Sequence, residues 1–199
     1  MKINPSLTFA VLLIFAPAAH AQFTYTNING TITITGYTNT NNVVVVPNTI
    51  DGMPVTGIGS FAFNFDTNLT SITVSKGVIS IGQRAFLNCT SLTNVNLPDS
   101  VMCIGRSAFA GCSSLSSVAI PQSVTSFYVA DIISPETFAD CTNLTRVFFQ
   151  GNAPRIGSVG SDSLFDGDNN ATVYYLAGTA GWTTNFGGAP RYWGHCLIL

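Results

Sequence analysis

Residues that could support enzyme catalysis are scarce in this 199-residue sequence, and they are not grouped. Nucleophilic catalysis by serine or cysteine needs a histidine base held rigidly beside the nucleophile. Beyond residue 21 the sequence has one histidine, His195, and it lies close to the last residue. Hydrolysis by paired carboxylates needs two acids at a fixed separation, yet Glu136 is the one glutamate among scattered aspartates. The sequence therefore predicts a protein without enzymatic activity and without a cofactor.

The cysteines are the second group with chemical potential, and they are Cys89, Cys103, Cys112, Cys141 and Cys196. Three of them, Cys89, Cys112 and Cys141, occupy one position of a repeat, and Asp66 occupies that position in another copy. Stacked copies would align these thiols in a column, where an exported protein permits a disulfide. The alternative is that each thiol is a small buried apolar group. No pair has the C-x2-C spacing of zinc sites, so we expect no zinc.

A small acidic cluster offers oxygen ligands in a glycine-containing stretch near the end of the sequence. It consists of Asp162, Asp166 and Asp168. A calcium loop that begins at Asp166 would place glycine sixth and glutamate twelfth, but the sequence has Ala171 and Ala177 there. The pattern meets part of the requirement, so a calcium site and an ordinary solvated turn both stay open.

Composition and charge limit the classes of partner. Charged residues make up 8% of the chain, against about 25% in typical soluble domains. Seven basic and nine acidic residues give a net charge of −2, without a basic patch that would attract nucleic acid. Gly, Ser, Thr and Asn supply most of the polarity, and these residues favour strands and turns over long helices. We therefore expect a mainly β protein that does not bind nucleic acid.

Residues 1–21 have the organisation of a signal peptide. Lys2 gives a short basic region, residues 7–16 form an apolar run, and Ala19-His20-Ala21 offers an A-x-A cleavage site. The apolar run is too short to span a bilayer, although a short membrane anchor is an alternative. No later segment reaches membrane length. The expected mature chain begins at Gln22, has no membrane span, and is secreted or held at the cell surface or in the periplasm.

A repeat of 23 residues organises the middle of the sequence. Copies begin at Ile58, Ile81 and Ile104, and a fourth begins at Ile133 after a spacing of 29 residues. Within each copy the apolar residues keep their positions: Phe63, Phe86, Phe109 and Phe138; Leu69, Leu92, Leu115 and Leu144; Ile72, Val95, Val118 and Val147. One copy cannot bury enough apolar surface to offset the entropy of ordering its chain, so the copies must stack. The conserved spacing predicts a solenoid.

The two flanks of the repeats lack the full pattern and are expected to cap the stack. Residues 22–57 have strand signals at 31–35 and 43–46 and form the predicted N-terminal β cap. The repeats occupy residues 58–155. Residues 156–199 are expected to hold a degraded last repeat, with a strand at 173–176, followed by a C-terminal cap or tail.

The repeat resembles the BspA-type leucine-rich repeats of bacterial surface and secreted proteins. The segments IGQRAFLNCTSLTNVNLP (81–98) and IGRSAFAGCSSLSSVAIP (104–121) carry the resemblance, which extends well over residues 58–151 and loosely over 156–176. It implies a solenoid with a parallel sheet on one face and short 3₁₀ or irregular turns on the other, convex side. Family members with known roles are mostly adhesins, so the resemblance also implies a binding function.

The outward face of the predicted strands holds the main candidate for ligand binding. Its middle positions are small or polar, whereas Arg146 and Phe148 in the fourth copy and Tyr174 in the last break this pattern. An arginine beside two aromatic rings is typical of interfaces. The alternative is that the C-terminal tail covers these residues through Trp182 or Trp193. Phe127 and Tyr128, at the six-residue insertion of the third copy, are secondary candidates because insertions form loops.

These observations predict an exported, non-enzymatic recognition or adhesion module that presents its repeat surface to an extracellular protein or glycan. One alternative is a structural spacer of the envelope or of secreted material, without a specific ligand. A glycan-processing enzyme is a further alternative, which the single glutamate and single mature histidine disfavour.

Overall fold

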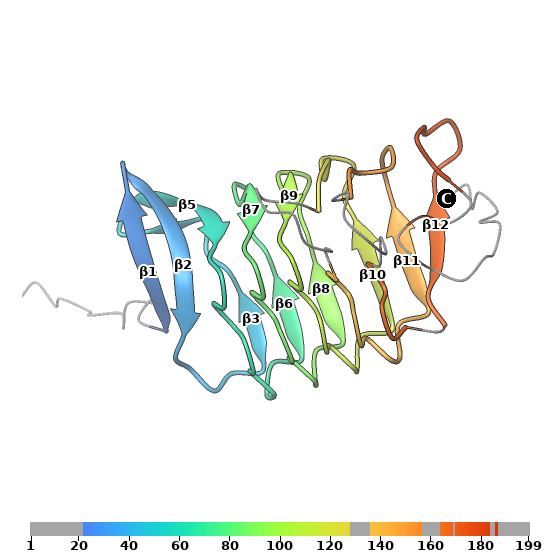
Figure 1. The fold of residues 1–199 in the computed structure, drawn as a ribbon. Coiled ribbons are helices and arrows are strands. Elements are labelled where there is room, and N and C mark those ends of the chain that lie inside the picture. Colours follow the sequence, from blue (N-terminus) through green and yellow to red (C-terminus); the bar gives the residue numbers. More distant parts are fainter. Residues whose placement is uncertain (1–21, 128–135, 157–163, 169, 184–185, 187–199) are drawn as a thin grey trace, which may run out of the picture.

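A computed structural model describes residues 22–127, 136–156, 164–168, 170–183 and 186. Within these ranges the chain winds through successive turns that stack along one axis (Figure 1). We call each turn a rung and name it by its core phenylalanine. The strands are β1 (Phe23–Ile28), β2 (Thr31–Tyr37), β3 (Val43–Val45), β4 (Thr49–Ile50), β5 (Met53–Ile58), β6 (Ser71–Thr73), β7 (Ser80–Ile81), β8 (Asn94–Asn96), β9 (Cys103–Ile104), β10 (Ser117–Ile120), β11 (Arg146–Phe149) and β12 (Thr172–Tyr175).

One face of the stack consists of parallel strands contributed by successive rungs. β3, β6 and β8 form one three-stranded sheet, and β10, β11 and β12 form another beside it (Figure 1). The register places Ile72 opposite Val95 and Val118 opposite Val147, and all four side chains are buried. Side chains alternate along a strand, so the flanking residues face solvent. This arrangement confirms the parallel sheet predicted from the repeat.

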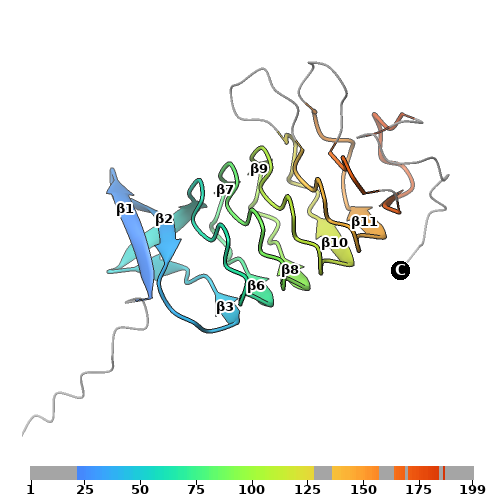
Figure 2. The ribbon, with the colours of Figure 1, turned by 60° about the horizontal axis from the view of Figure 1, so that its bottom comes forward.

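A second and narrower parallel ladder lies on another face and was not predicted (Figure 2). It joins β5, β7 and β9, with Ile58 opposite Ile81 and Ile81 opposite Ile104. Isolated bridges continue the ladder through Ser126 and Arg155. β7 and β9 are two residues long, which is too short for an alternating pattern to reveal them in the sequence. The leading isoleucines of the first three copies, Ile58, Ile81 and Ile104, are buried in this ladder, and Ile133 lies outside the described residues.

Stacked aromatic rings form a column through the core. The rings of Phe63 and Phe86 are 5.0 Å apart, those of Phe86 and Phe109 are also 5.0 Å apart, and Phe138 follows at 5.5 Å. Phe165 extends the column at 5.8 Å, so the degraded last repeat keeps its core phenylalanine despite its longer spacing. Parallel rungs bring equivalent residues into contact, which is why one apolar position becomes a continuous column.

The segment between the two ladders is made of consecutive turns rather than a helix. In the Phe86 rung, the N–H of Ala85 donates to Gly82 O and that of Leu87 donates to Arg84 O. The N–H of Phe86 itself donates to Ala108 O in the next rung, at 2.7 Å. Hydrogen bonds between rungs therefore replace the bonds that a helix would make within itself. This confirms the irregular turns that the family resemblance implies.

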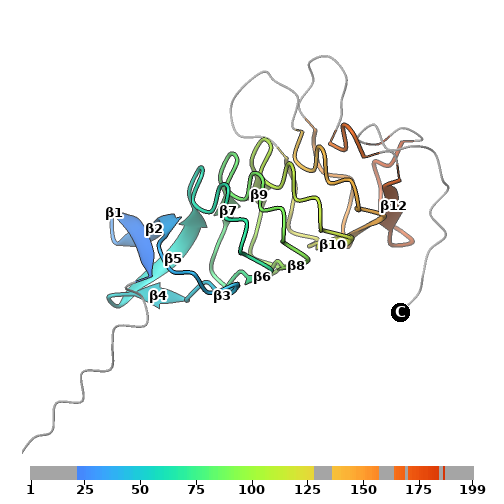
Figure 3. The ribbon, with the colours of Figure 1, turned by 90° about the horizontal axis from the view of Figure 1, so that it is seen from below.

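The stack is preceded by an antiparallel hairpin of β1 and β2 (Figures 1 and 3). β2 also pairs in parallel with β5, and the ring of Tyr37 packs against Phe63 in a tilted arrangement, with centroids 5.6 Å apart. The hairpin therefore joins both the ladder and the aromatic column. β3 pairs with β6 and is the first strand of its sheet. Across the ranges given above, no helix has the length and apolar character needed to cross a bilayer.

Candidate ligand-binding surface

Sheet register brings together the three main candidates from the sequence. Phe148 in β11 is paired with Tyr174 in β12, and Arg146 is paired with Thr172. The rings of Phe148 and Tyr174 stack with their centroids 5.0 Å apart and an interplanar angle of 25°. Arg146 lies two residues before Phe148, so both side chains leave the same face of the sheet. Arg146 is exposed and the two rings are half-buried, so the three residues form one accessible cluster.

This cluster ends two columns of outward side chains. The first column contains Val43, Ser71, Asn94, Ser117, Arg146 and Thr172, and the second contains Val45, Thr73, Asn96, Ala119, Phe148 and Tyr174. In the middle, the Asn94 amide donates to Ser71 Oγ at 3.1 Å. Val43 and Val45 at the other end are each 59% exposed. The arginine and the two aromatic rings thus distinguish the C-terminal end of this face from its polar middle.

Trp182 does not cover this cluster. Its ring stacks on Tyr175 at 4.7 Å and contacts the edge of Phe149 at 5.1 Å. Phe149 and Tyr175 follow Phe148 and Tyr174 in the strands, so they point to the opposite face. Trp182 therefore closes the end of the core. Trp193, the other residue considered as a cover, lies outside the described residues.

The secondary candidate Phe127 is a core residue. It is 1% exposed, and its ring meets the rings of Phe138 and Phe149 edge-on at 6.3 and 6.1 Å. Its ring is therefore not accessible to a ligand. Tyr128 lies outside the described residues.

The acidic cluster is divided between solvent and core. Asp166 is exposed, whereas Asp168 is 3% exposed and lies three residues after Phe165. This is the position of the cysteine in earlier rungs, so Asp168 is not part of a solvated turn. Burial raises the pKa of Asp168 to about 7, and the neighbouring Asp140 adds to the rise. Asp162 lies outside the described residues. Among the residues that the structure describes, no three or more His, Cys, Asp or Glu side chains are grouped so that they could hold a metal ion.

The repeat cysteines are buried thiols that bond to the preceding rung. The Sγ atoms of Cys89, Cys112 and Cys141 donate to the carbonyl oxygens of Phe63, Phe86 and Phe109, at 3.0, 3.2 and 3.1 Å. All three thiols are free in the structure, as is the half-buried Cys103. Burial raises the pKa of Cys89 to about 12, so its reactive thiolate is disfavoured. Of the two roles considered for these cysteines, the structure has the apolar, structural one.

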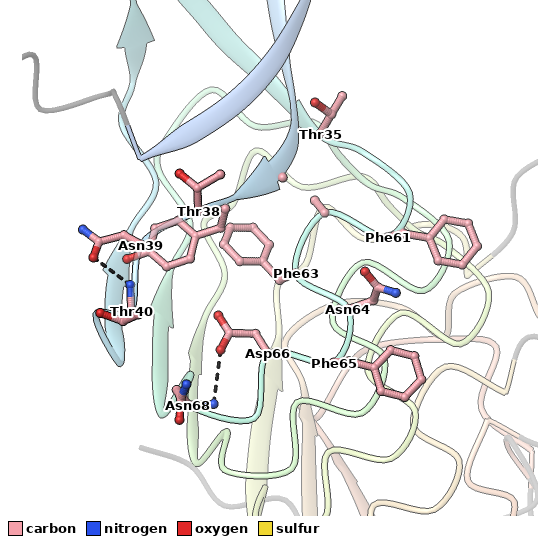
Figure 4. A pocket seen from close by; sticks show the side chains of 13 residues that line it. Thr35, Thr38, Asn39, Thr40, Phe61, Phe63, Asn64, Phe65, Asp66 and Asn68 are labelled. Carbon is pink, nitrogen blue, oxygen red and sulfur yellow. Dashed lines mark hydrogen bonds between the residues drawn. The ribbon is translucent and has the colours of Figure 1, made fainter.

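A pocket at the opposite end of the stack was not found from the sequence. It has a volume of about 450 Å³ and lies between residues 35–40, at the end of β2, and the first turns of the Phe63 rung (Figure 4). Phe61 and Phe65 are at its margin and are 44% and 61% exposed. The equivalent residues of the next rung are Arg84 and Asn88. The sequence signal that could have indicated this pocket is the pair of aromatic residues at outward positions of the repeat.

The family model for the BspA type leucine rich repeat region matches residues 56–160 in six copies. The chain belongs to the BspA-type leucine-rich repeat family. This agrees with the repeat positions, the parallel sheets and the irregular turns described above. None of the curated proteins compared with the chain matches it.

Solved structures of bacterial leucine-rich repeat proteins share the fold. One from Bacteroides capillosus is 33% identical, has a TM-score of 0.55, and covers 65% of this chain and 95% of its own. The leucine rich repeat protein of T. pallidum is 29% identical, with a TM-score of 0.54, over 64% of this chain and 68% of its own. A leucine rich cell surface protein of Faecalibacterium prausnitzii is 22% identical, with a TM-score of 0.50, over 78% of this chain and 53% of its own. The last likeness shows the fold alone.

Membership of the BspA-type family explains the geometry of the candidate cluster. The repeat fixes which residues of each rung are buried, so the outward residues are the ones that can vary without loss of the fold. In this chain the outward residues change from small polar groups to arginine and aromatic groups in the last two strands. The repeats therefore provide a scaffold, and the outward side chains determine what it can contact.

Proposed function

We propose that this BspA-type protein is a non-enzymatic recognition module that binds an extracellular protein or glycan through Arg146, Phe148 and Tyr174. The observation that carries the proposal is the stacked, half-exposed pair Phe148–Tyr174 beside an exposed arginine on a flat strand surface. A pre-stacked aromatic pair loses little side-chain freedom on binding, and arginine supplies donors in a fixed geometry. Each of these properties favours adhesion over turnover of a substrate.

We further propose that the protein acts outside the cytoplasm. The support is the signal-peptide pattern of residues 1–21, together with the surface location stated for the F. prausnitzii protein of the same fold. Expression of the full chain in a bacterial host, followed by mass spectrometry of the exported protein, tests this. We expect a mature N-terminus at Gln22, and Ala21→Lys to block processing. Full-length protein retained in the cytoplasm would contradict export.

The binding proposal is tested with a panel of extracellular-matrix proteins and glycans. The native protein is compared with the triple variant Arg146→Ala, Phe148→Ala, Tyr174→Ala by surface plasmon resonance. A matched control, Ser71→Ala, Thr73→Ala, Asn94→Ala, alters the same face two to four strands away. We expect saturable binding that the triple variant loses and the control keeps. Binding that survives in the triple variant would refute the site, and no saturable binding to the panel would favour the spacer alternative.

A further inference from the structure

The pocket beside Phe61 and Phe65 has backbone acceptors without partners, because of how the rungs are joined. From the Phe63 rung onward, N–H groups of one rung donate to carbonyl oxygens of the next: Phe61 to Gln83, Phe63 to Ala85, and Phe65 to Leu87. The same bonds join the Phe86 rung to Ala108 and Ala110. At these turn positions the bonds run in one direction, so the carbonyl oxygens there need a preceding rung to fill them. At the start of each turn the direction is reversed, as where Gly82 N–H donates to Ile58 O.

The Phe63 rung has no such predecessor at these positions. Its equivalent carbonyl oxygens belong to Ser60, Ala62 and Asn64, and within the described part of the chain no group donates to them. β2 covers only the beginning of this edge, where the N–H of Gly59 donates to Ile34 O at 2.7 Å. Beyond that point residues 35–40 diverge from the turns, and the pocket lies between the two segments, with Ala62 and Asn64 in its wall (Figure 4). The wall thus offers backbone acceptors to which no described group donates.

The aromatic residues beside these acceptors adopt a costly backbone conformation. Phe61 has φ 63° and Phe65 has φ 59°, in the left-handed region that bulky residues avoid. The same left-handed backbone recurs at these positions in the later rungs, at Arg84, Asn88, Ser107, Gly111, Glu136, Asp140 and Gly167, so it belongs to the repeat. The Phe63 rung differs in placing two aromatic rings there, 44% and 61% exposed, beside the unfilled acceptors. Exposed aromatic rings beside unfilled acceptors at a pocket favour the binding of a ligand.

The chemistry of the pocket selects the class of that ligand. Beside the carbonyl oxygens, its wall holds threonine and asparagine side chains and one carboxylate, Asp66, whose Oδ1 accepts from the N–H groups of Asn68 and Leu69. None of the residues that line the pocket is basic, and the nearby guanidinium of Arg84 lies over the ring of Phe61, 5.8 Å from its centroid. An anion at the carbonyl oxygens would therefore meet acceptors and the Asp66 carboxylate. A ligand must instead bring neutral donors and an apolar face that can lie against an aromatic ring.

We propose that this pocket binds a neutral saccharide, at a site separate from the Arg146 cluster. Sugar hydroxyls are neutral donors that can reach Ala62 O and Asn64 O. The C–H face of a sugar ring stacks on the ring of Phe65, which is 61% exposed, whereas Arg84 lies over Phe61. The volume of about 450 Å³ falls within the roughly 300–1,000 Å³ of small-ligand sites. An extended peptide also carries donors, but the left-handed residues in the wall break the straight spacing that a strand would need.

The experiment titrates the full chain with cellohexaose, maltohexaose and mannohexaose, and with a sulfated heparin hexasaccharide and a neutral six-residue Thr/Val peptide for comparison. Binding is followed by calorimetry and by the ¹³C carbonyl resonances of Ala62 and Asn64. We expect a neutral hexaose to bind saturably and to shift both resonances. The absence of such shifts with all three hexaoses, or equal shifts with the sulfated sugar or the peptide, would overturn the proposal.

A pair of glycine variants separates ligand binding from folding. Phe65→Gly removes the ring and relieves the left-handed strain, so we expect at least a tenfold loss of hexaose affinity with an unchanged or higher Tm. Asn88→Gly makes the same backbone change one rung later (φ 57°) and should keep the affinity. Hexaose binding that survives in Phe65→Gly would refute the site. The Arg146→Ala, Phe148→Ala, Tyr174→Ala variant should bind the hexaose normally, which distinguishes the two sites.

Discussion

Asp168 occupies in the last described rung the position that Cys141 occupies in the rung before it. Cys141 donates its thiol proton to Phe109 O, and Asp168 lies buried at the end of the same column. An ionised carboxylate has no proton to donate, and no described group donates to either of its oxygens. A bond from the Cys141 N–H would lower the pKa of Asp168, but this N–H donates to Phe138 O. Burial is therefore the main influence on Asp168, and it favours the protonated acid.

This burial predicts a stability that falls as pH rises. The pKa of Asp168 is raised from 3.8 to about 7, so the folded state binds more protons than the unfolded state between these values. The stability that the protonated Asp168 contributes to the folded state is fully present below pH 3.8 and is lost as the pH rises through about 7. A shift of about three units corresponds to about 4 kcal/mol, and solvent screening at the end of the stack reduces this to about 2 kcal/mol. We expect Asp168→Asn to be more stable than the native chain at pH 8 by about that amount.

Urea unfolding of both proteins at pH 4 and pH 8 measures the effect. The difference in unfolding free energy should be small at pH 4 and should favour Asp168→Asn at pH 8. Asp166→Asn is the matched control, because Asp166 is two residues away and exposed. Equal pH profiles for the native chain and Asp168→Asn would contradict the assignment.

The aromatic column predicts a large loss of stability when a central ring is removed. Phe109 is fully buried and stacks on both Phe86 and Phe138. Phe109→Ala leaves a cavity that both neighbouring rungs share, so we expect a loss of about 3–5 kcal/mol in chemical unfolding. Phe109→Asp should abolish folding of the middle rungs. Ile28→Ala, at a residue 62% exposed, should change the unfolding free energy by less than about 0.5 kcal/mol. An unchanged transition in Phe109→Asp would mean that the repeat register is wrong.

The glycine that follows the leading isoleucine is expected to be intolerant of a side chain. A Cβ added at Gly105 would lie 2.6 Å from the backbone nitrogen of Gln83 in the preceding rung, so the rungs would have to separate. We expect Gly105→Ala to lower the Tm by several degrees, corresponding to about 2 kcal/mol or more. A Cβ at Gly57 would approach the Thr33 hydroxyl at 3.2 Å, which a side-chain rotation can relieve. Similar Tm values for Gly105→Ala and Gly57→Ala would contradict this close packing of rungs.

The buried thiols predict selective alkylation. Cys89, Cys112 and Cys141 are fully buried. The pKa of Cys89 is raised by burial, and the pKa of Cys112 is raised by the neighbouring Cys141 and by burial. Iodoacetamide at pH 8 should therefore modify none of the three in the folded protein and all three in urea, as mapped by peptide mass spectrometry. Cys103, which is half-buried, should react faster than these three. Rapid labelling of Cys112 without denaturant would contradict its burial.

The repeat positions made most of the core predictable, because a residue type that recurs every 23 positions has one structural role. The four phenylalanines, the four leucines and the inward strand residues are all buried as expected. The ladder of β5, β7 and β9 could not be predicted, since two-residue strands leave no period. The burial of Asp168 was not predicted, because the sequence around it resembles a calcium loop. Its position three residues after Phe165 is the repeat position of the buried cysteines.

The candidate cluster was predictable for a similar reason. The positions of Arg146, Phe148 and Tyr174 hold small or polar residues in the middle copies. Because equivalent residues of neighbouring strands are paired, Phe148 lies against Tyr174 and their rings stack. The pocket by Phe61 and Phe65 forms where β2 diverges from the first turns. Its acceptors are backbone carbonyl oxygens, which every residue has whatever its side chain. Side-chain patterns do not report on unfilled backbone acceptors, so three-dimensional coordinates were needed to find them.

The one-way hydrogen bonds between the turns give the molecule two chemically different ends. At these turns the first rung presents acceptors and each later rung presents donors onward, so a contact between two copies through these groups would be head-to-tail. Such a contact does not close on itself and would propagate into a fibre. The antiparallel β1–β2 hairpin occupies part of the acceptor side, because β2 pairs with β5 there. The hairpin therefore covers part of the edge that such a contact would need.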